Sequence, residues 1–390
     1  MPFVSLGLVL APSAHAADSD YQDSPGSNTA GAPIGEGDVV VDATRVLVLA
    51  PAEITAMGGA GHAFARGANG LVFQPAAPVN RRIDQTKPFG VSLAFTQHAL
   101  PPGGLSDVAN LGYDSDAAGG MANLGIAAFW RNFGAGLVYS GIEYKSDDAT
   151  LSITEGHLAA GGSYADGQLV IGLGLRGLSM RADRAGKGVD YQGLGGEVGV
   201  MGTRLWGGWN LGASVRSPVR ATPTNDDLSI GVDAAVVPLQ VALGLGWTDA
   251  ESGVARPIRV AADLTYDGAV PEGFALESAI LGVAVERGNE ATLSPHLGLE
   301  YEAIPRRLRL RAGTYLEPTR TVWGEDRIHA TTGFEVRLFR LRLFKGFIDT
   351  EIAWEAAADY APNYLNVAWL GIGAWDSGVI GGNWAEAAAP

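Results

Sequence analysis

The chain has 390 residues, of which 55 are glycine, 47% are hydrophobic and none is cysteine. Its formal net charge of −15 argues against nucleic acid as a partner, because phosphate binding needs clustered basic surface. After the extreme N-terminus, no uncharged apolar run reaches the ~20 residues that a membrane-spanning helix needs. This composition fits two classes of protein: a membrane β-barrel, in which each strand gives only half its side chains to lipid, or a glycine-rich soluble β protein.

The first residues are typical of a cleaved export signal. Phe3–Leu10 is a short apolar core, and Ser13–Ala16 offers a small-x-small cleavage pattern. No cationic residue comes before Arg45, so an incidentally apolar N-terminus is the alternative. We expect a signal peptide at residues 1–17 and a flexible lead-in at 18–45, whose Gly, Ser, Asp and Pro cannot build a core.

Residues 46–87 are dominated by small side chains. From Ala52 to Ala77 they show neither two-residue alternation nor a helical stripe of apolar residues. Their Gly and Ala content suits a backbone that packs closely against other backbone.

Strand-like segments follow from residue 88 to residue 376. In Gln168–Arg181, large apolar residues alternate with Gly172, Gly174 and Arg176. A soluble sandwich needs large inward side chains to fill its core, whereas a barrel whose lumen holds another segment needs small ones. The barrel is therefore favoured. Fifteen such segments can be identified, and because bacterial single-chain barrels have an even strand number we expect about 14 strands and one merged or false segment. The segments are 89–97, 121–131, 136–144, 153–164, 168–181, 191–203, 205–217, 238–248, 258–266, 274–286, 292–302, 307–316, 328–343, 347–355 and 364–375.

A late hairpin alternates arginine with leucine and then carboxylates with isoleucine. Arg340 and Arg342 share one strand face because successive side chains point to opposite faces. If Lys345-Gly346 is a two-residue turn, Arg342 faces Asp349 and Arg340 faces Glu351.

The preceding hairpin repeats this pattern. A turn at 303–306 would place Glu302 opposite Arg307 and Glu300 opposite Arg309. An arginine facing lipid at the bilayer midplane costs about 2–4 kcal/mol, so the charged face should line a wet interior. These lumen ion pairs either balance charge across the lumen, or exclude some solutes, or bind a carboxylate head group.

Several stretches resemble the FadL-type outer-membrane transport proteins. Met57–Ala65 and Ala68–Ala76 resemble the N-terminal signature of that family, and Gly212–Pro218, Arg259–Tyr266 and Leu308–Tyr315 resemble later strands in the same order. The resemblance implies an all-β fold: a transmembrane antiparallel β-barrel of about 14 strands at 88–376, an N-terminal hatch at 46–87 in the lumen, and a C-terminal tail at 377–390. It places these residues in the hatch: Met57, Gly58, Gly59, Ala60, Gly61, His62, Phe64, Phe73, Gln74 and Pro75.

The roles of individual hatch residues stay open. His62 is either a hydrogen-bonded packing residue or part of a gate. Phe64 and Phe73 either pack the hatch or touch a hydrophobic ligand.

No motif indicates catalysis. Gly172–Gly177 fits G-x-G-x-x-G, but it lies inside an alternating strand rather than at a strand–turn–helix junction. The six histidines have no metal-ligand spacing, and no Ser/His/acid constellation can be placed together. We expect no enzyme activity, no cofactor and no metal.

The resemblance implies an integral protein of the outer membrane of a Gram-negative bacterium, in contact with membrane lipid and lipopolysaccharide. Its expected function is to pass fatty-acid-like hydrophobic small molecules by diffusion past the hatch. Gln74 replaces a usual Asn, and the connection 183–190 is short where fatty-acid transporters carry a long loop. These departures support an alternative, a non-transporting docking subunit whose protein partners form a secretion, motility or surface-assembly complex.

Overall fold

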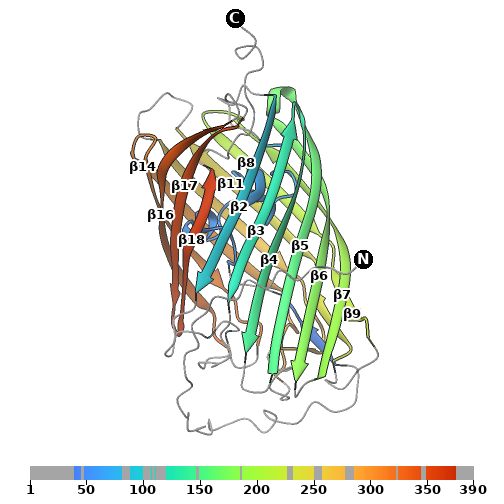
Figure 1. Cartoon of the computed structure of the whole chain (residues 1–390). Helices are drawn as coiled ribbons and strands as arrows, with labels where there is room; N and C mark the ends of the chain where they lie inside the picture. Colours follow the sequence, from blue (N-terminus) through green and yellow to red (C-terminus); the bar gives the residue numbers. More distant parts are fainter. Residues whose placement is uncertain are drawn as a thin grey trace, which may run out of the picture.

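Fourteen strands of the computed structural model form one closed antiparallel barrel (Figure 1). The structure describes residues 39–44, 48–80, 88–99, 107, 110, 120–145, 149–184, 187–225, 232–249, 257–276, 285–321, 324–343 and 348–374. The barrel closes because β18 pairs with β2 and β8 pairs with β11. The predicted fold class and strand number are confirmed. The barrel strands are β2 (Phe89–Ala99), β3 (Met121–Trp130), β4 (Phe133–Lys145), β5 (Ala149–Tyr164), β6 (Leu169–Arg184), β7 (Lys187–Gly202), β8 (Trp209–Arg216), β11 (Gln240–Thr248), β12 (Ile258–Asp267), β14 (Thr292–Ile304), β15 (Leu308–Glu317), β16 (Arg327–Leu343), β17 (Ile348–Ala361) and β18 (Tyr364–Ala374).

The false segment is 274–286. β12 pairs directly with β14 from Ile258↔Tyr301 to Asp267↔Thr292, which leaves no place for a barrel strand between them. The described part of this connection forms only β13 (Gly273–Phe274) and a bridge from Phe274 to Glu286. Residues 277–284 lie outside the described residues.

A smaller sheet extends the wall at one end of the barrel. β9 (Val219–Pro223) and β10 (Ala234–Val237) are antiparallel, and β1 (Val40–Asp42) lies parallel between β10 and β13. The end of the predicted flexible lead-in is therefore a strand. Asp42 fastens it, because its Oδ2 lies 2.8 Å from Nε of Arg320 and 3.4 Å from Nε of Arg287.

The two ends of the barrel differ in their connections. At the short-turn end, η1 (Ala165–Gly167) joins β5 to β6, and residues 305–307 join β14 to β15. At the opposite, long-connection end, residues 268–291 join β12 to β14, and β1, β9, β10 and β13 lie there.

The outward face of the wall carries an apolar band. On β6, Leu173 and Leu175 are 64% and 55% exposed, and on β14 Leu297 is 55% exposed. The inward neighbours on these strands are small or charged, and the charged residues of β14 and β15 are buried. The predicted sidedness of this hairpin is confirmed.

The pattern inverts on the strands that extend toward the long-connection end. On β6, Leu178 and Met180 are buried inward, whereas Ser179 and Arg181 are exposed outward. Inward apolar residues of β4 to β7 pack there with β1, β9 and β10 into one hydrophobic cluster. At this end the lumen is a packed apolar core rather than the wet interior that the sequence predicted.

Residues 48–80, which we call the lumenal segment, lie inside the barrel and are almost entirely buried (Figure 1, blue). They contain two helices of five residues each, α1 (Ala52–Ala56) and α2 (Gly67–Leu71), joined by turns. Among the described residues, no helix is long and apolar enough to cross a membrane.

Candidate functional site

Glycines of the wall let the lumenal segment approach at backbone distance. A Cβ atom at Gly298 would lie 2.6 Å from the carbonyl oxygen of Met57, and one at Gly134 would lie 2.7 Å from that of Pro78. Real Cβ atoms do not approach backbone this closely, so any side chain at these positions would displace the segment. The small residues of Ala52–Ala77 and the glycines of the wall are therefore complementary surfaces, as their composition predicted.

One carboxylate holds the centre of the lumenal segment. Oδ2 of Asp263 on β12 lies 2.7 Å from the backbone nitrogen of Gly61, 2.9 Å from that of His62 and 2.9 Å from Nδ1 of His62. Asp263 is only 5% exposed. The sequence singled out this aspartate only as the central acid of a family-like strand. Its spacing gave no sign that it binds residues 200 positions earlier.

Further side chains fasten the segment at several points of the wall. They share one arrangement, in which a side-chain donor reaches a backbone carbonyl oxygen. The pairs are His296 Nδ1 with Gly58 O at 2.7 Å, Thr331 Oγ1 with Ala56 O at 3.0 Å, Arg216 with Val72 O, and Gln74 Nε2 with Ala213 O at 3.1 Å and Val200 O at 3.3 Å. Gln74, predicted as a hatch residue, is thus an anchor and is fully buried.

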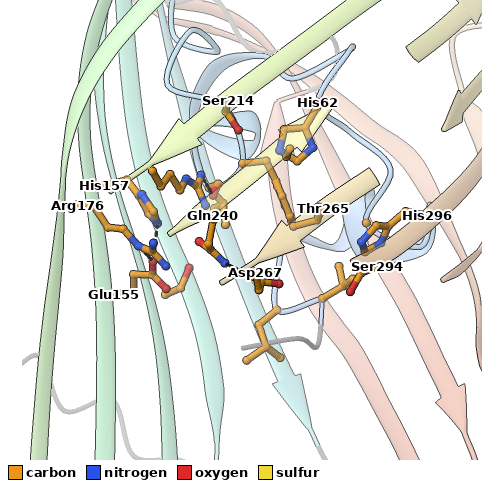
Figure 2. Close-up of a pocket in the computed structure, with 18 residues that line it drawn as sticks. His62, Glu155, His157, Arg176, Ser214, Gln240, Thr265, Asp267, Ser294 and His296 are labelled. Atoms are coloured by element: carbon orange, nitrogen blue, oxygen red, sulfur yellow. Dashed lines mark hydrogen bonds and ion pairs between the residues drawn. The ribbon is translucent and has the colours of Figure 1, made fainter. Parts of the chain in front are cut away.

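The lumenal segment separates two cavities. The first has a volume of about 110 Å³, lies toward the long-connection end and is lined by Gly59, His62 and Phe73 of the segment (Figure 2). The second has a volume of about 70 Å³ and lies toward the short-turn end. The residues of the segment that line it include Met57, Ala60, Gly61 and Phe64. The ring of His62 meets that of Phe73 edge-on, with ring centroids 5.6 Å apart.

The first cavity has an apolar side and a polar side. Val48, Leu49, Val72 and Phe73 of the lumenal segment make the apolar side. The wall supplies the polar side, with Figure 2 showing Glu155, His157 and Arg176 grouped at one flank and Ser294 and His296 at the other. A molecule there would meet hydrocarbon on one face and hydrogen-bonding groups on the other.

These wall residues belong to a ring of polar side chains, which we call the polar girdle, to which every barrel strand contributes. Hydrogen bonds, ion pairs and ring contacts link most neighbours in it. In strand order from β2, its members are His98, Asn123, Ser140, His157, Arg176, Glu197, Arg216, Gln240, Asp267, His296, Tyr315, His329, Asp359 and Asn366.

The girdle is most strongly bonded around His329. Its Nδ1 lies 2.8 Å from Oδ1 of Asp359, and its Nε2 lies 2.9 Å from Oε2 of Glu317. The hydroxyl of Tyr315 donates to Asp359 Oδ2 at 2.7 Å, and the Tyr315 and His329 rings stack with centroids 4.1 Å apart. All of these side chains are buried, so the contacts fix the wall's inner surface.

The side of the girdle that borders the first cavity is ionic. His157 Nδ1 lies 3.0 Å from Glu197 Oε2, and Arg216 Nε lies 3.2 Å from the same oxygen. Arg176 pairs through Nε with Glu155, and Gln240 donates to Asp267 Oδ1 at 2.6 Å.

The ion pairs of β14 and β15 differ from the predicted ones by two residues. Glu300 pairs with Arg311 at 2.7 Å and Glu302 with Arg309 at 3.4 Å, so the predicted pairs Glu302–Arg307 and Glu300–Arg309 are wrong. A bulge between Glu302 and Ile304 places Ile304 opposite Leu308 and leaves Arg307 exposed in the turn. The slip keeps Glu300, Glu302 and Arg309 on their predicted face because side-chain direction repeats every two residues, whereas Arg307 leaves that face for the turn.

Two neighbours complete this buried ion network near the second cavity. Arg309 Nη1 lies 3.3 Å from Glu335 Oε2, and Arg311 also pairs with Glu335. Arg259 Nη1 of β12 lies 3.3 Å from Glu300 Oε1. The predicted ion pairs did not include Arg311 or Glu335, because the network spans strands whose contact depends on register.

The register predicted for the last hairpin is confirmed. Arg340 stands opposite Glu351 and Arg342 opposite Asp349. The side chains of these four residues and the turn at Lys345-Gly346 lie outside the described residues, so their ion pairs remain predictions.

Within the described ranges, no group of three or more His, Asp or Glu residues is arranged to hold a metal ion.

Comparison with known proteins identifies the fold. No family model and no curated protein matches this sequence. A solved structure titled "CymD monoaromatic hydrocarbon channel" is similar with a TM-score of 0.53 and 12% identity, covering 84% of this chain and 96% of that chain. Another, "TodX deltaS2S3 mutant monoaromatic hydrocarbon channel", gives a TM-score of 0.51 and 15% identity over 84% of this chain and 98% of that chain. Both are FadL-type channels, so the predicted resemblance is confirmed at the level of the fold.

Proposed function

We propose that the protein is an outer-membrane channel for hydrophobic small molecules and acts without catalysis. The observation that carries this proposal is a closed barrel with an outward apolar band around a lumen that holds its own N-terminal segment. Such a band is the surface that lipid tails solvate. The two solved structures that share the fold are titled hydrocarbon channels, which supports the same class of cargo.

The lumenal segment acts as the hatch in this proposal. It lies between the two cavities, so cargo passing from one to the other must displace some of its contacts. Its apolar side chains Val72 and Phe73 face the first cavity, and a hydrophobic cluster fills the lumen beyond that cavity. Both features favour apolar cargo.

An interruption of strand pairing along β7 is the second exit in this proposal. β7 pairs with β8 as far as Glu197 and with β9 only at Tyr191 and Gln192, and Pro218 interrupts the neighbouring strand between these points. Gly193–Gly196 lie in the interval. Contacts still close the wall there, since the Ser217 N–H donates to Gly196 O at 2.8 Å and the backbone of Arg220 packs against Gly193. Because fewer ladder bonds hold the wall here than elsewhere, cargo leaving sideways into lipid would break fewer of them.

The test of transport is uptake of a labelled fatty acid and a labelled aromatic hydrocarbon. The host is a Gram-negative bacterium that lacks its own channel for such compounds. We expect uptake to rise several-fold when the protein is present in the outer membrane. Equal uptake with and without the protein would refute the proposal.

A disulfide lock tests the hatch separately. A Cβ at Gly125 on β3 would lie 3.3 Å from Cβ of Ala68, close to the separation of bonded cysteines. Because the chain has no cysteine, Ala68→Cys with Gly125→Cys gives a single possible bridge. Oxidation should stop uptake and reduction should restore it. Full uptake by the oxidised variant would show that the segment does not move.

The second candidate is a non-transporting docking subunit of an envelope complex. The many side-chain anchors of the lumenal segment favour it, because a segment fastened to several strands resists displacement. Affinity purification from native membranes separates the two: a stoichiometric protein partner together with unchanged uptake would support docking.

A further inference from the structure

The first cavity holds polar atoms that its own walls do not satisfy. Among the described residues, Nη1 of Arg176, Oε1 of Gln240 and Oγ of Ser294 are buried without a hydrogen-bond partner. All three side chains line the cavity, and they come from β6, β11 and β14; Figure 2 shows Arg176 and Ser294 at opposite flanks with Gln240 between them. Buried polar groups in proteins are normally hydrogen-bonded, so one small cavity bordered by three unsatisfied ones is equipped for a polar guest.

The charges around the cavity select the kind of polar group. Among the residues that line the cavity, Arg176 and Arg216 supply two positive charges, and Glu155 and Asp267 supply two negative ones. Glu197, which pairs with Arg216 and His157, is not among the lining residues. A carboxylate head group would bring an extra charge into this balanced, buried set, and an uncharged group avoids that cost.

The hydrogen-bonding capacity of the unsatisfied atoms matches a hydroxyl group on the bound molecule. The guanidinium nitrogen of Arg176 can only donate, the amide oxygen of Gln240 can only accept, and the hydroxyl of Ser294 can do either. A hydroxyl group on the cargo both donates and accepts, so it can satisfy both kinds.

The apolar side limits the rest of the molecule. Val48, Leu49, Val72 and Phe73 offer a hydrocarbon surface, and the cavity volume is about 110 Å³. This is less than the roughly 150 Å³ of an apolar cavity that takes one benzene ring, so the cavity encloses the polar end of a cargo molecule and only part of a ring.

We infer that the first cavity is a selectivity site for the hydroxyl end of uncharged cargo of the phenol class. This inference rests on the proposed channel function and narrows its substrate class. Toluene would find the apolar side but leave Gln240 and Ser294 unsatisfied, and an aromatic carboxylate would bring an unbalanced charge into the buried site.

Three probes with the same tolyl group test the inference: toluene, p-cresol and p-toluate. At pH 7 p-cresol is uncharged, because a phenol has a pKa near 10, and p-toluate is ionised. Binding to the detergent-solubilised protein is measured by saturation-transfer NMR, and uptake of the labelled probes is measured in cells as above. We expect p-cresol to bind and enter several-fold better than either relative.

The variant Ser294→Ala removes one acceptor without changing charge. We expect it to lower p-cresol affinity roughly three- to tenfold, as the loss of one hydrogen bond does, while toluene is unaffected. Ser179→Ala is the matched control, because Ser179 is exposed on the outward face of β6. Ser294 has no described partner, so its removal should not impair folding, and a thermal melt checks this.

The outcomes separate this inference from the proposed function. Equal binding of all three probes, preference for p-toluate, or an unchanged p-cresol affinity in Ser294→Ala would overturn the inference and leave the channel intact. Selective p-cresol binding without uptake of any probe would support the site and overturn transport.

Discussion

His62 of the lumenal segment and Asp263 of β12 are joined at 2.9 Å between Nδ1 and Oδ2. The same oxygen accepts the backbone N–H groups of Gly61 and His62. One wall carboxylate therefore fixes both the position of the segment's backbone and the orientation of its only histidine. This contact decides the packing role of His62 that the sequence left open, and its role in gating remains a prediction.

Replacing Asp263 with asparagine should loosen the lumenal segment. Asparagine keeps the size of the side chain but removes the charge that strengthens these hydrogen bonds, which contribute about 1.5–3 kcal/mol each when the acceptor is ionised. We expect a lower melting temperature and a rise in single-channel conductance in planar bilayers. The exposed turn residue Asp166 gives a matched control, Asp166→Asn. An unchanged melt and conductance for Asp263→Asn would show that the anchor is dispensable.

Adding one methyl group at Gly298 should disturb the fit between wall and segment. The new Cβ would lie 2.6 Å from Met57 O, so either the segment or the strand must shift, at a cost of about 1–3 kcal/mol. Gly141 provides the comparison, because a Cβ there would meet nothing closer than 3.8 Å. Urea unfolding in lipid vesicles should show Gly298→Ala destabilised and Gly141→Ala unchanged or about 0.5–1 kcal/mol more stable. Equal stability of the two variants would contradict the close packing.

Arg311 should be the most costly charge to remove. Its side chain is 1% exposed and pairs with Glu300 and Glu335. Arg311→Met therefore leaves each of these buried carboxylates with a single arginine partner, Arg259 and Arg309 respectively. Removing one partner of a buried pair destabilises by about 3–5 kcal/mol.

The exposed pair Arg181–Asp183 serves as the control for Arg311. Here Arg181→Met should change the free energy of unfolding by less than about 1 kcal/mol, because solvent screens the pair. Denaturant titration in vesicles compares the two variants, and a similar small effect for both would show that the lumen around Arg311 is well hydrated.

A charged substitution on the outward face should be costly within the apolar band and tolerated on the part of the wall beyond it. Leu173→Arg places a cation at a position 64% exposed within the band, where lipid raises the cost to about 2–4 kcal/mol. Ser179→Arg, six residues along the same face of β6, should cost little because its neighbours there are polar. Folding yield into vesicles checks both variants. Equal yields would argue against lipid contact at Leu173.

The sequence predicted which strand face each charged residue occupies more accurately than it predicted which residues form ion pairs. Alternation placed Glu300, Glu302 and Arg309 on the lumenal face, where they lie, but assigned them partners two residues away from the real ones. A shift of two residues leaves every side chain on its own face, so the periodicity contains no information about it. The bulge before Ile304 sets the register, and it depends on how the turn packs.

Two other features of the fold could not be predicted from local sequence patterns. The segment 274–286 alternates like a strand, yet β12 and β14 pair directly and leave no room for it in the wall. On β6, apolar residues point outward at Leu175 and inward at Leu178. This change depends on which parts of the structure contact each face of the strand. The apolar residues point inward there because they pack against β1, β9 and β10 at this end of the barrel.

By itself, the sequence predicted alternating strands with small and charged residues on the inward face, and it favoured a barrel over a soluble sandwich. Period-two alternation and glycine content are local properties. Each residue's size and hydrophobicity are enough to show which face of a strand it suits. The tertiary structure alone decided that Asp263 holds His62, that Arg311 pairs with Glu300, and that Arg176, Gln240 and Ser294 meet around one cavity. These contacts join residues far apart in the chain, and their geometry is set by barrel closure and strand register, which no local pattern contains.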